Sequence, residues 1–79
     1  MSQLSQVRKA LTDKLIEWAK DERQAEIIID CFTEFFDAAE WPEEEQLMIL
    51  EQTRDYFVDG FIRDRLIYEI TAIKVNGGY

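Results

Sequence analysis

Apolar side chains recur at helical spacing over the first twenty residues. They lie three or four residues apart and form one stripe of an α-helix: Leu4, Val7, Leu11, Leu15 and Trp18. Charged residues fall mostly on the opposite side, and either Ser2 or Ser5 suits the N-cap position. The pattern predicts a helix near residues 3–20 with one buried face.

A second helix is predicted near residues 22–40, and it has more apolar residues than one buried face can hold. Asp21 and Gln24 suit its N-terminal capping positions. No glycine or proline separates it from the first helix, so one long bent helix is an alternative. Seven apolar side chains stand within ten positions: Ile27, Ile28, Ile29, Cys31, Phe32, Phe35 and Phe36. Because they cover well over half of the circumference, this helix needs more than one neighbour, and a homodimer through it is one way to supply the second.

Trp41-Pro42 marks the clearest break along the chain. Proline disfavours a helical residue before it and suits the first position of a new helix. A third helix is therefore predicted near residues 42–59, with three glutamates in its first turn, where the helix dipole favours negative charge. Asp59-Gly60 predicts the end of this helix or a kink.

The segment 61–75 has two interpretations. Ile62, Leu66 and Ile70 follow helical spacing, whereas residues 66–73 are rich in strand-forming types. A lone strand has nothing to pair with in this chain, so helix is favoured, ending at Asn76-Gly77-Gly78. Together the patterns predict an all-α protein: a single domain over residues 1–79, folded as a small three- to four-helix bundle, with a homodimer as an option.

The composition argues against an enzyme, a cofactor site or a metal centre. The chain has no histidine, which removes the commonest catalytic base and zinc ligand, and its single cysteine excludes an intramolecular disulfide. Cys31 lies in the most apolar helix, so we expect a small buried core residue of low reactivity. The glycines form no phosphate-binding loop, and the carboxylates lack the spacing of a calcium loop.

We expect no direct binding to nucleic acid and no insertion into membranes. The chain has nine basic and 17 acidic residues, and its basic residues are too scattered to line a nucleic-acid groove. Its longest apolar runs are far shorter than the roughly 20 residues that span a bilayer. The polar N-terminus does not resemble a signal peptide, so the predicted location is the cytoplasm.

Acidic side chains are concentrated in the middle of the chain. Residues 21–60 carry a net charge of −11, whereas residues 1–20 and 61–79 carry +2 and +1. On helices these acids form a row from Glu26 to Asp37, a cluster around Trp41-Pro42 and a row from Glu44 to Asp59. Such a field attracts basic surfaces. The residues predicted to contact a protein partner are Glu40, Trp41, Glu43, Glu44, Glu45, Glu51, Asp55 and Asp59.

Two function classes fit this pattern. The leading prediction is a non-enzymatic module that docks on a basic surface of another protein. Its narrowest version is a DNA-mimicking inhibitor of the virus- or mobile-element type, because carboxylates four residues apart on a helix lie about 6 Å from each other, a spacing comparable to that of phosphates. The alternative is a structural or assembly subunit that self-associates through apolar helix faces while the acids supply solubility. Trp41 likewise has two interpretations, a cap on the core or an exposed binding anchor.

Overall fold

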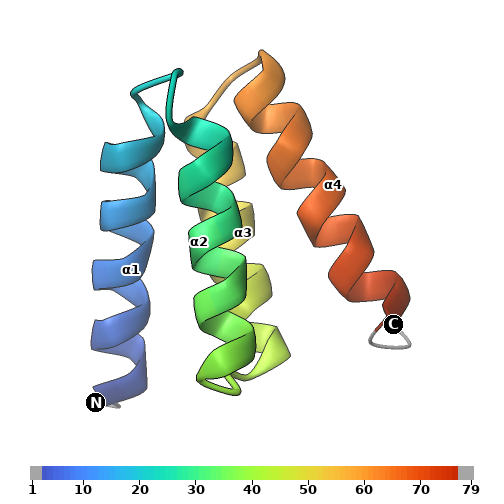
Figure 1. Ribbon diagram of the computed structural model, residues 1–79. Helices are drawn as coiled ribbons and strands as arrows, with labels where there is room; N and C mark the ends of the chain where they lie inside the picture. The colour runs from blue at the N-terminus through green and yellow to red at the C-terminus, as the bar shows by residue number, and fades with distance from the viewer. Residues whose placement is uncertain (1–2, 77–79) are drawn as a thin grey trace.

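Four helices follow one another in the computed structural model, which describes residues 3–76 (Figure 1). Their bounds are α1 Gln3–Ala19, α2 Ala25–Ala38, α3 Glu43–Tyr56 and α4 Phe61–Asn76. The prediction of a small all-α bundle is confirmed, and the strand interpretation of residues 61–75 is wrong. Ser2, Gly77 and Gly78, which we considered as helix ends, lie outside the described residues, as does the side chain of Leu4.

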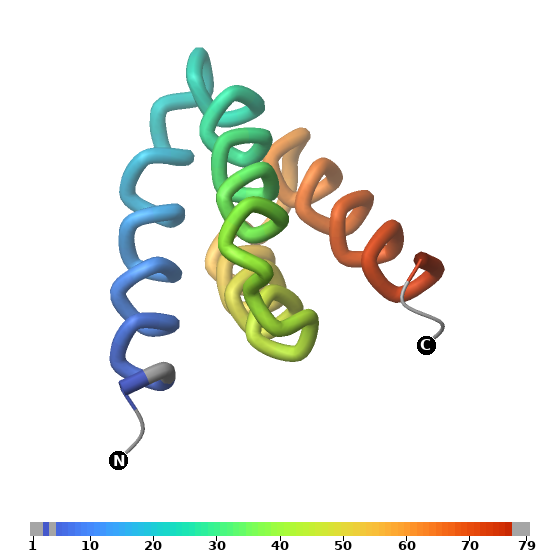
Figure 2. The backbone as a smooth tube through the Cα atoms, turned by 60° about the horizontal axis from the view of Figure 1, so that its bottom comes forward, coloured from blue at the N-terminus to red at the C-terminus, as the bar shows by residue number. Residues whose placement is uncertain are grey.

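The helices form a ring in which consecutive elements run in opposite directions (Figure 1). α1 packs on both α2 and α3, whereas α4 packs mainly on α3. Both views show α4 leaning away from α2 toward its C-terminal end (Figure 1, Figure 2). Helix α2 is therefore covered closely by α1 on one flank and loosely by α4 on the other.

Side chains from all four helices form one hydrophobic core. Its buried members are Leu15, Ala19, Ala25, Ile29, Phe32, Phe36, Leu47, Ile49, Leu50, Ile62, Leu66 and Ile70. From α2 the core takes a single stripe that begins at Ala25 and ends at Phe36, its members three or four residues apart. The other apolar residues of α2 point elsewhere, and they become important for the surface described below.

A turn at residues 20–24 separates the first two helices, so the single bent helix does not occur. Within this turn the Oδ1 atom of Asp21 accepts a hydrogen bond from the backbone N–H of Arg23 at 3.2 Å. Asp21 therefore supports the turn and does not cap α2, which begins at Ala25, later than the predicted residue 22. Within the turn, the Lys20 ammonium lies over the Tyr56 ring at 5.1 Å, and interaction with the Tyr56 side chain raises the pKa of Lys20 above its ordinary value.

Helix α3 ends at Tyr56, so the prediction that it extends to residue 59 is wrong. Phe57 has an extended backbone, and the Arg63 guanidinium donates hydrogen bonds to the carbonyl oxygens of Arg54 and Phe57 at 2.9 and 3.1 Å. Arg63 thus satisfies carbonyl groups at the end of α3 that have no partner within the helix. The chain then turns at Gly60, whose φ of 97° lies in a region that side chains disfavour.

We expect Gly60→Ala to lower the free energy of unfolding by about 1 kcal/mol, because an L side chain is strained at this positive φ. Apart from Gly60 and its two chain neighbours, no heavy atom of the described residues lies within 4 Å of the place that a Cβ would take, so the loss comes from backbone conformation and not from a clash. Urea denaturation followed by circular dichroism measures it. The control Asp59→Ala, in the same turn, should change stability by less than about 0.5 kcal/mol. Equal losses in the two variants would contradict this explanation.

Candidate protein-binding surface

The turn between α2 and α3 is closed by backbone hydrogen bonds at the end of α2. The N–H of Glu40 donates to the carbonyl oxygen of Asp37 at 3.2 Å, and the N–H of Trp41 donates to that of Phe36 at 2.9 Å. This pair of bonds is the Schellman motif, which requires a left-handed residue at the position of Glu40. Glu40 indeed has a φ of 52°, in a place where glycine is usually found. The motif fixes the direction in which the following acidic residues point.

Four carboxylates gather at this turn, and we call them the acidic corner: Asp37, Glu40, Glu43 and Glu44. All four side chains are exposed. None of them forms a salt bridge within the described part of the chain. Three members of the predicted contact set, Glu40, Glu43 and Glu44, are thus exposed at this turn and have no salt-bridge partner among the described residues.

The remaining predicted carboxylates are placed differently. Glu45 is held by Arg8 of α1 at 3.1 Å, and only 15% of its side chain is exposed. Glu51 lies 3.7 Å from Lys74 of α4, and Asp55 lies 3.2 Å from the neighbouring Arg54. Because Glu45 pairs with α1 and Glu51 with α4, these acids lie on opposite flanks of α3 and do not form one acidic face.

Asp59 is exposed but lies beyond the end of α3, in the turn to α4. The predicted helical row from Glu44 to Asp59 is therefore interrupted. The row on α2 is more open, since Glu26, Glu34 and Asp37 are exposed and only Asp30 is paired, with Arg65 of α4. The uncompensated negative charge thus lies on α2 and its turns more than on α3.

Trp41 is half-buried and packs against the hydrophobic core. Its ring centroid lies 6.3 Å from that of Phe35, which is itself 45% exposed. The indole Nε1 atom is buried and has no hydrogen-bond partner among the described residues. The placement favours the role of a cap on the core, while the contact with Phe35 links the acidic corner to a second surface.

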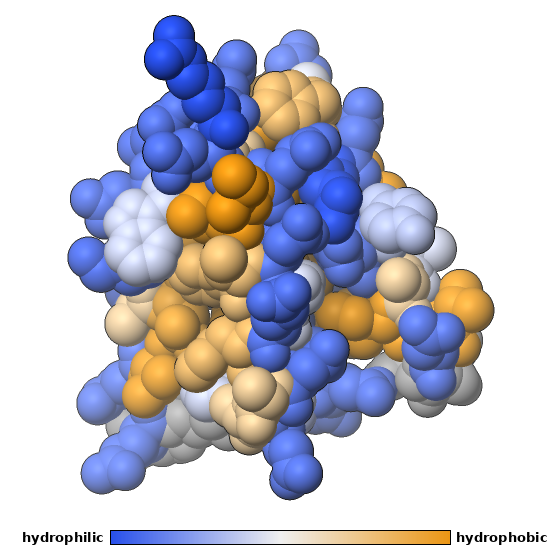
Figure 3. All heavy atoms as spheres, in the orientation of Figure 1, coloured by the Kyte–Doolittle hydropathy of each residue, from blue (hydrophilic) through white to orange (hydrophobic). Residues whose placement is uncertain are grey.

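This second surface is an apolar groove between α1 and α2. We call it the α1–α2 groove; it has a volume of about 270 Å³ and is lined by Leu11, Trp18, Cys31, Phe32 and Phe35. Figure 3 shows apolar side chains gathered in a strip over these two helices, with hydrophilic residues at its borders. Trp18 and Phe35 are each about half exposed, at 47% and 45%. The molecule thus leaves large aromatic surface open to solvent in a concave site.

Cys31 is exposed in this groove, so the prediction of a buried core cysteine is wrong. Once Ile29, Phe32 and Phe36 take the core stripe, helical geometry places Cys31 and Ile27 on the outward side. Ile27 is accordingly 61% exposed. The sequence indicates this exposure, because the apolar residues of α2 form two parallel stripes and only one of them can face the core. The number of apolar residues alone does not distinguish the two stripes.

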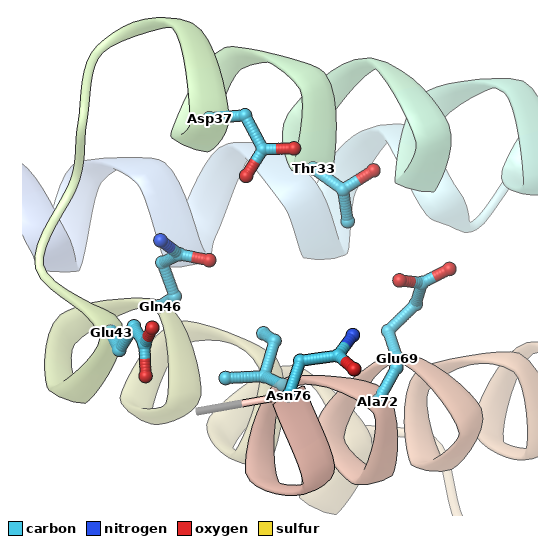
Figure 4. Close-up of a pocket in the computed structure, with 8 residues that line it drawn as sticks. Thr33, Asp37, Glu43, Gln46, Glu69, Ala72 and Asn76 are labelled. Atoms are coloured by element: carbon cyan, nitrogen blue, oxygen red, sulfur yellow. The ribbon is translucent and has the colours of Figure 1, made fainter. Parts of the chain in front are cut away.

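A polar cleft opens where α4 leans away from α2 (Figure 4). It has a volume of about 240 Å³, and its lining comes from three helices: Thr33, Asp37, Glu43, Gln46, Glu69, Ala72, Ile73 and Asn76. Glu69 is paired with Arg65 at 2.9 Å, and Gln46 donates a hydrogen bond to the carbonyl oxygen of Trp41 at 2.7 Å. Over the described residues, no group of three acidic or cysteine side chains is arranged to hold a metal ion.

Comparison of the chain with protein-family models, curated proteins and solved structures gave no match. None of the helices in the described range combines the length and apolar composition needed to cross a bilayer.

We expect Glu40→Gly to raise the free energy of unfolding by about 1 kcal/mol, because glycine removes the strain of a side chain in the left-handed region. Thermal and urea denaturation measure the change. Glu40→Ala is the matched control: it removes the same charge but keeps the Cβ atom, so it should not reproduce the gain. If both variants stabilise the protein equally, charge and not backbone strain is the cause.

Proposed function

We propose that this protein is a non-enzymatic binding module, acting in the cytoplasm, whose acidic corner docks on a basic surface of another protein. One observation carries the proposal. The four exposed carboxylates of the acidic corner have no salt bridge among the described residues, and one of them, Glu40, directly precedes Trp41, whose ring lies against the partly exposed Phe35. Charged groups steer and orient a partner, while aromatic groups supply most of the contact energy at such surfaces.

Local stability alone explains only part of this corner. Glu43 and Glu44 lie in the first turn of α3, where the helix dipole favours them. Asp37, in contrast, lies near the C-terminal end of α2, where the dipole favours cations, and the last turn of α2 has no basic residue. Glu40 has a backbone conformation that suits glycine. Two acids kept where they cost stability support a role in binding.

A DNA-mimicking inhibitor is the narrower form of the same proposal. It needs a regular series of accessible carboxylates on a rigid element, comparable to the phosphates of one strand. On α3 this series is weakened because Glu51 is paired with Lys74 and Asp55 with Arg54. Asp59 lies outside the helix. The open acids of α2 and the acidic corner provide its remaining support.

Charge reversal at the acidic corner tests the proposal. We expect the triple variant Glu40→Lys, Glu43→Lys and Glu44→Lys to lose a basic protein that the wild-type chain captures from a lysate of its source cells at low salt. The matched control reverses three other predicted contact residues, Glu51, Asp55 and Asp59, and changes the net charge equally. We expect this control to retain the captured protein.

Salt and fold provide the checks on this experiment. Capture of the basic protein should decline between about 50 and 500 mM salt, because screening weakens surface electrostatics. Circular dichroism must give the same helix content for both triple variants. Capture that survives high salt and the reversal of the acidic corner would refute the proposal.

Self-association is a second candidate function, favoured by the exposed apolar residues of α2. Phe36 is fully buried, so of the two adjacent phenylalanines only Phe35 is available for such a contact. Each copy carries a net charge of −8, which opposes the approach of a second copy.

We expect light scattering on the purified chain to give the monomer mass of 9.4 kDa, unchanged by Phe35→Ala. Repulsion between acidic copies is the reason, and dilution from about 1 mM to 10 μM should not change the mass. A dimer that Phe35→Ala dissociates would favour the assembly subunit over the binding module.

A further inference from the structure

The α1–α2 groove continues toward the turn between these helices. A second hollow there is lined by Glu17, Trp18, Asp21, Gln24 and Ile28, and it shares Trp18 with the groove. From Phe35 to Gln24 the lining follows α2 for about 16 Å, at 1.5 Å per residue. The extended groove is therefore long enough for about three turns of a docked helix.

The floor of this groove is made by packed aromatic rings. The rings of Trp18 and Phe32 meet edge to face, with centroids 5.9 Å apart. Phe32 is buried, whereas Trp18 and Phe35 expose nearly half of their surface, which is about 100 Å² for a large aromatic side chain. Because the rings are already held by their neighbours, a partner gains apolar contact there at little cost in side-chain ordering.

The rim of the groove is acidic. Asp21 lies at its upper end, and Glu34 follows Cys31 by one helical turn on the outer edge of α2; both are exposed and form no salt bridge within the described residues. Of the cations nearby, Lys14 lies over the Trp18 ring at 5.8 Å and is paired with Glu17 at 3.7 Å, and Arg23 is exposed in the turn that holds Asp21. With Asp21 and Glu34 against Arg23, which forms no salt bridge among the described residues, the net charge around the apolar floor is negative.

Charge decides between the occupants of such a groove. A second copy of this chain would bring the same acidic rim and a net charge of −8 against the first, so repulsion opposes it. A helix with basic residues beside its apolar stripe complements both the floor and the rim. This is the helix-in-groove mode, in which apolar residues three, four and seven positions apart serve as anchors.

We propose that the extended α1–α2 groove binds one basic amphipathic helix of about three turns, with its apolar face on Trp18, Cys31 and Phe35 and its cations near Asp21 and Glu34. The proposal names a class of partner for the proposed function. It rests on that function only for the basic character of the partner. The groove itself is a separate surface from the acidic corner, joined to it through the contact of Phe35 with Trp41.

The test uses two synthetic 18-residue peptides of lysine and leucine with a fluorescent label. One places its leucines on one helical face; the other has the same composition with the leucines dispersed around the helix. We expect the amphipathic peptide to bind the full chain at least tenfold more tightly by fluorescence anisotropy. It should also slow the reaction of Cys31, the only cysteine, with the uncharged reagent N-ethylmaleimide at least tenfold.

Variants locate the binding site. Phe35→Ala should weaken binding of the amphipathic peptide about tenfold or more, whereas Phe61→Ala should leave it unchanged. Phe61 is the matched control because the two phenylalanines are similarly exposed, at 45% and 44%. Cys31→Arg places a charge at an exposed position in the groove and should abolish tight binding without removing a core side chain. The double variant Asp21→Lys and Glu34→Lys should weaken binding and reduce its dependence on salt. Circular dichroism verifies the fold of each variant.

Several results would overturn the proposal. Equal binding of the two peptides would mean that charge alone attracts them, and the acidic binding module would stand without a groove. Binding that is indifferent to both Phe35→Ala and Cys31→Arg would place the helix elsewhere. A dimer of the unliganded chain that Phe35→Ala dissociates would make a second copy the occupant. A different pair of results would separate the two proposals. If the amphipathic peptide binds the groove but reversal of the acidic corner leaves partner capture unchanged, the proposed role of the acidic corner is refuted and the groove proposal stands.

Discussion

Helix α2 has more apolar surface than the other helices cover, and the remaining features of the molecule depend on this excess. One stripe of α2, which includes Ile29 and Phe36, is buried in the core. The second apolar stripe lies at the α1 flank of α2, in the α1–α2 groove, where α1 does not cover it and it faces solvent. Ile27 and Phe35 are exposed on that stripe. The flank of α2 that α4 leaves uncovered is a different one, the polar cleft lined by Thr33 and Asp37.

The open apolar stripe of α2 is joined to the acidic corner by one contact between aromatic rings. Phe35 belongs to the open stripe, and its ring lies against Trp41, which follows the Schellman motif at the end of α2. A hydrophobic contact between the residue after the left-handed position and the last turn commonly accompanies this motif. The same contact that ends α2 therefore places an aromatic surface next to Glu40, whereas Asp37 and Glu43 line the polar cleft on the other flank of α2.

The four helices could be predicted because a periodicity of three to four residues reports directly on the backbone. The sequence pattern gives the faces of a helix but not the neighbours that those faces meet, so Cys31 was assigned to the core although it lies on the outward stripe. The end of α3 depends on Arg63, which approaches from the next helix to bind the carbonyl oxygen of Arg54. The pairing of Glu45 with Arg8 joins residues 37 positions apart. Such contacts arise only from the tertiary arrangement, and they decided which predicted carboxylates stay accessible.

The basic residues of the terminal helices decide which acids of α2 and α3 keep an uncompensated charge. Arg8 of α1 and Lys74 of α4 approach α3 from opposite flanks and compensate Glu45 and Glu51 there. On α2, Arg65 compensates Asp30, whereas Glu26 and Glu34 have no salt bridge among the described residues. The acids without a salt bridge therefore lie mainly on α2 and its two turns; Glu34 stands beside the apolar stripe, whereas Glu26 and Asp37 lie toward the α4 flank. In the proposed binding mode, a basic helix that contacts Glu34 also meets the apolar stripe beside it, and a partner that lacks either property would gain only part of the binding energy.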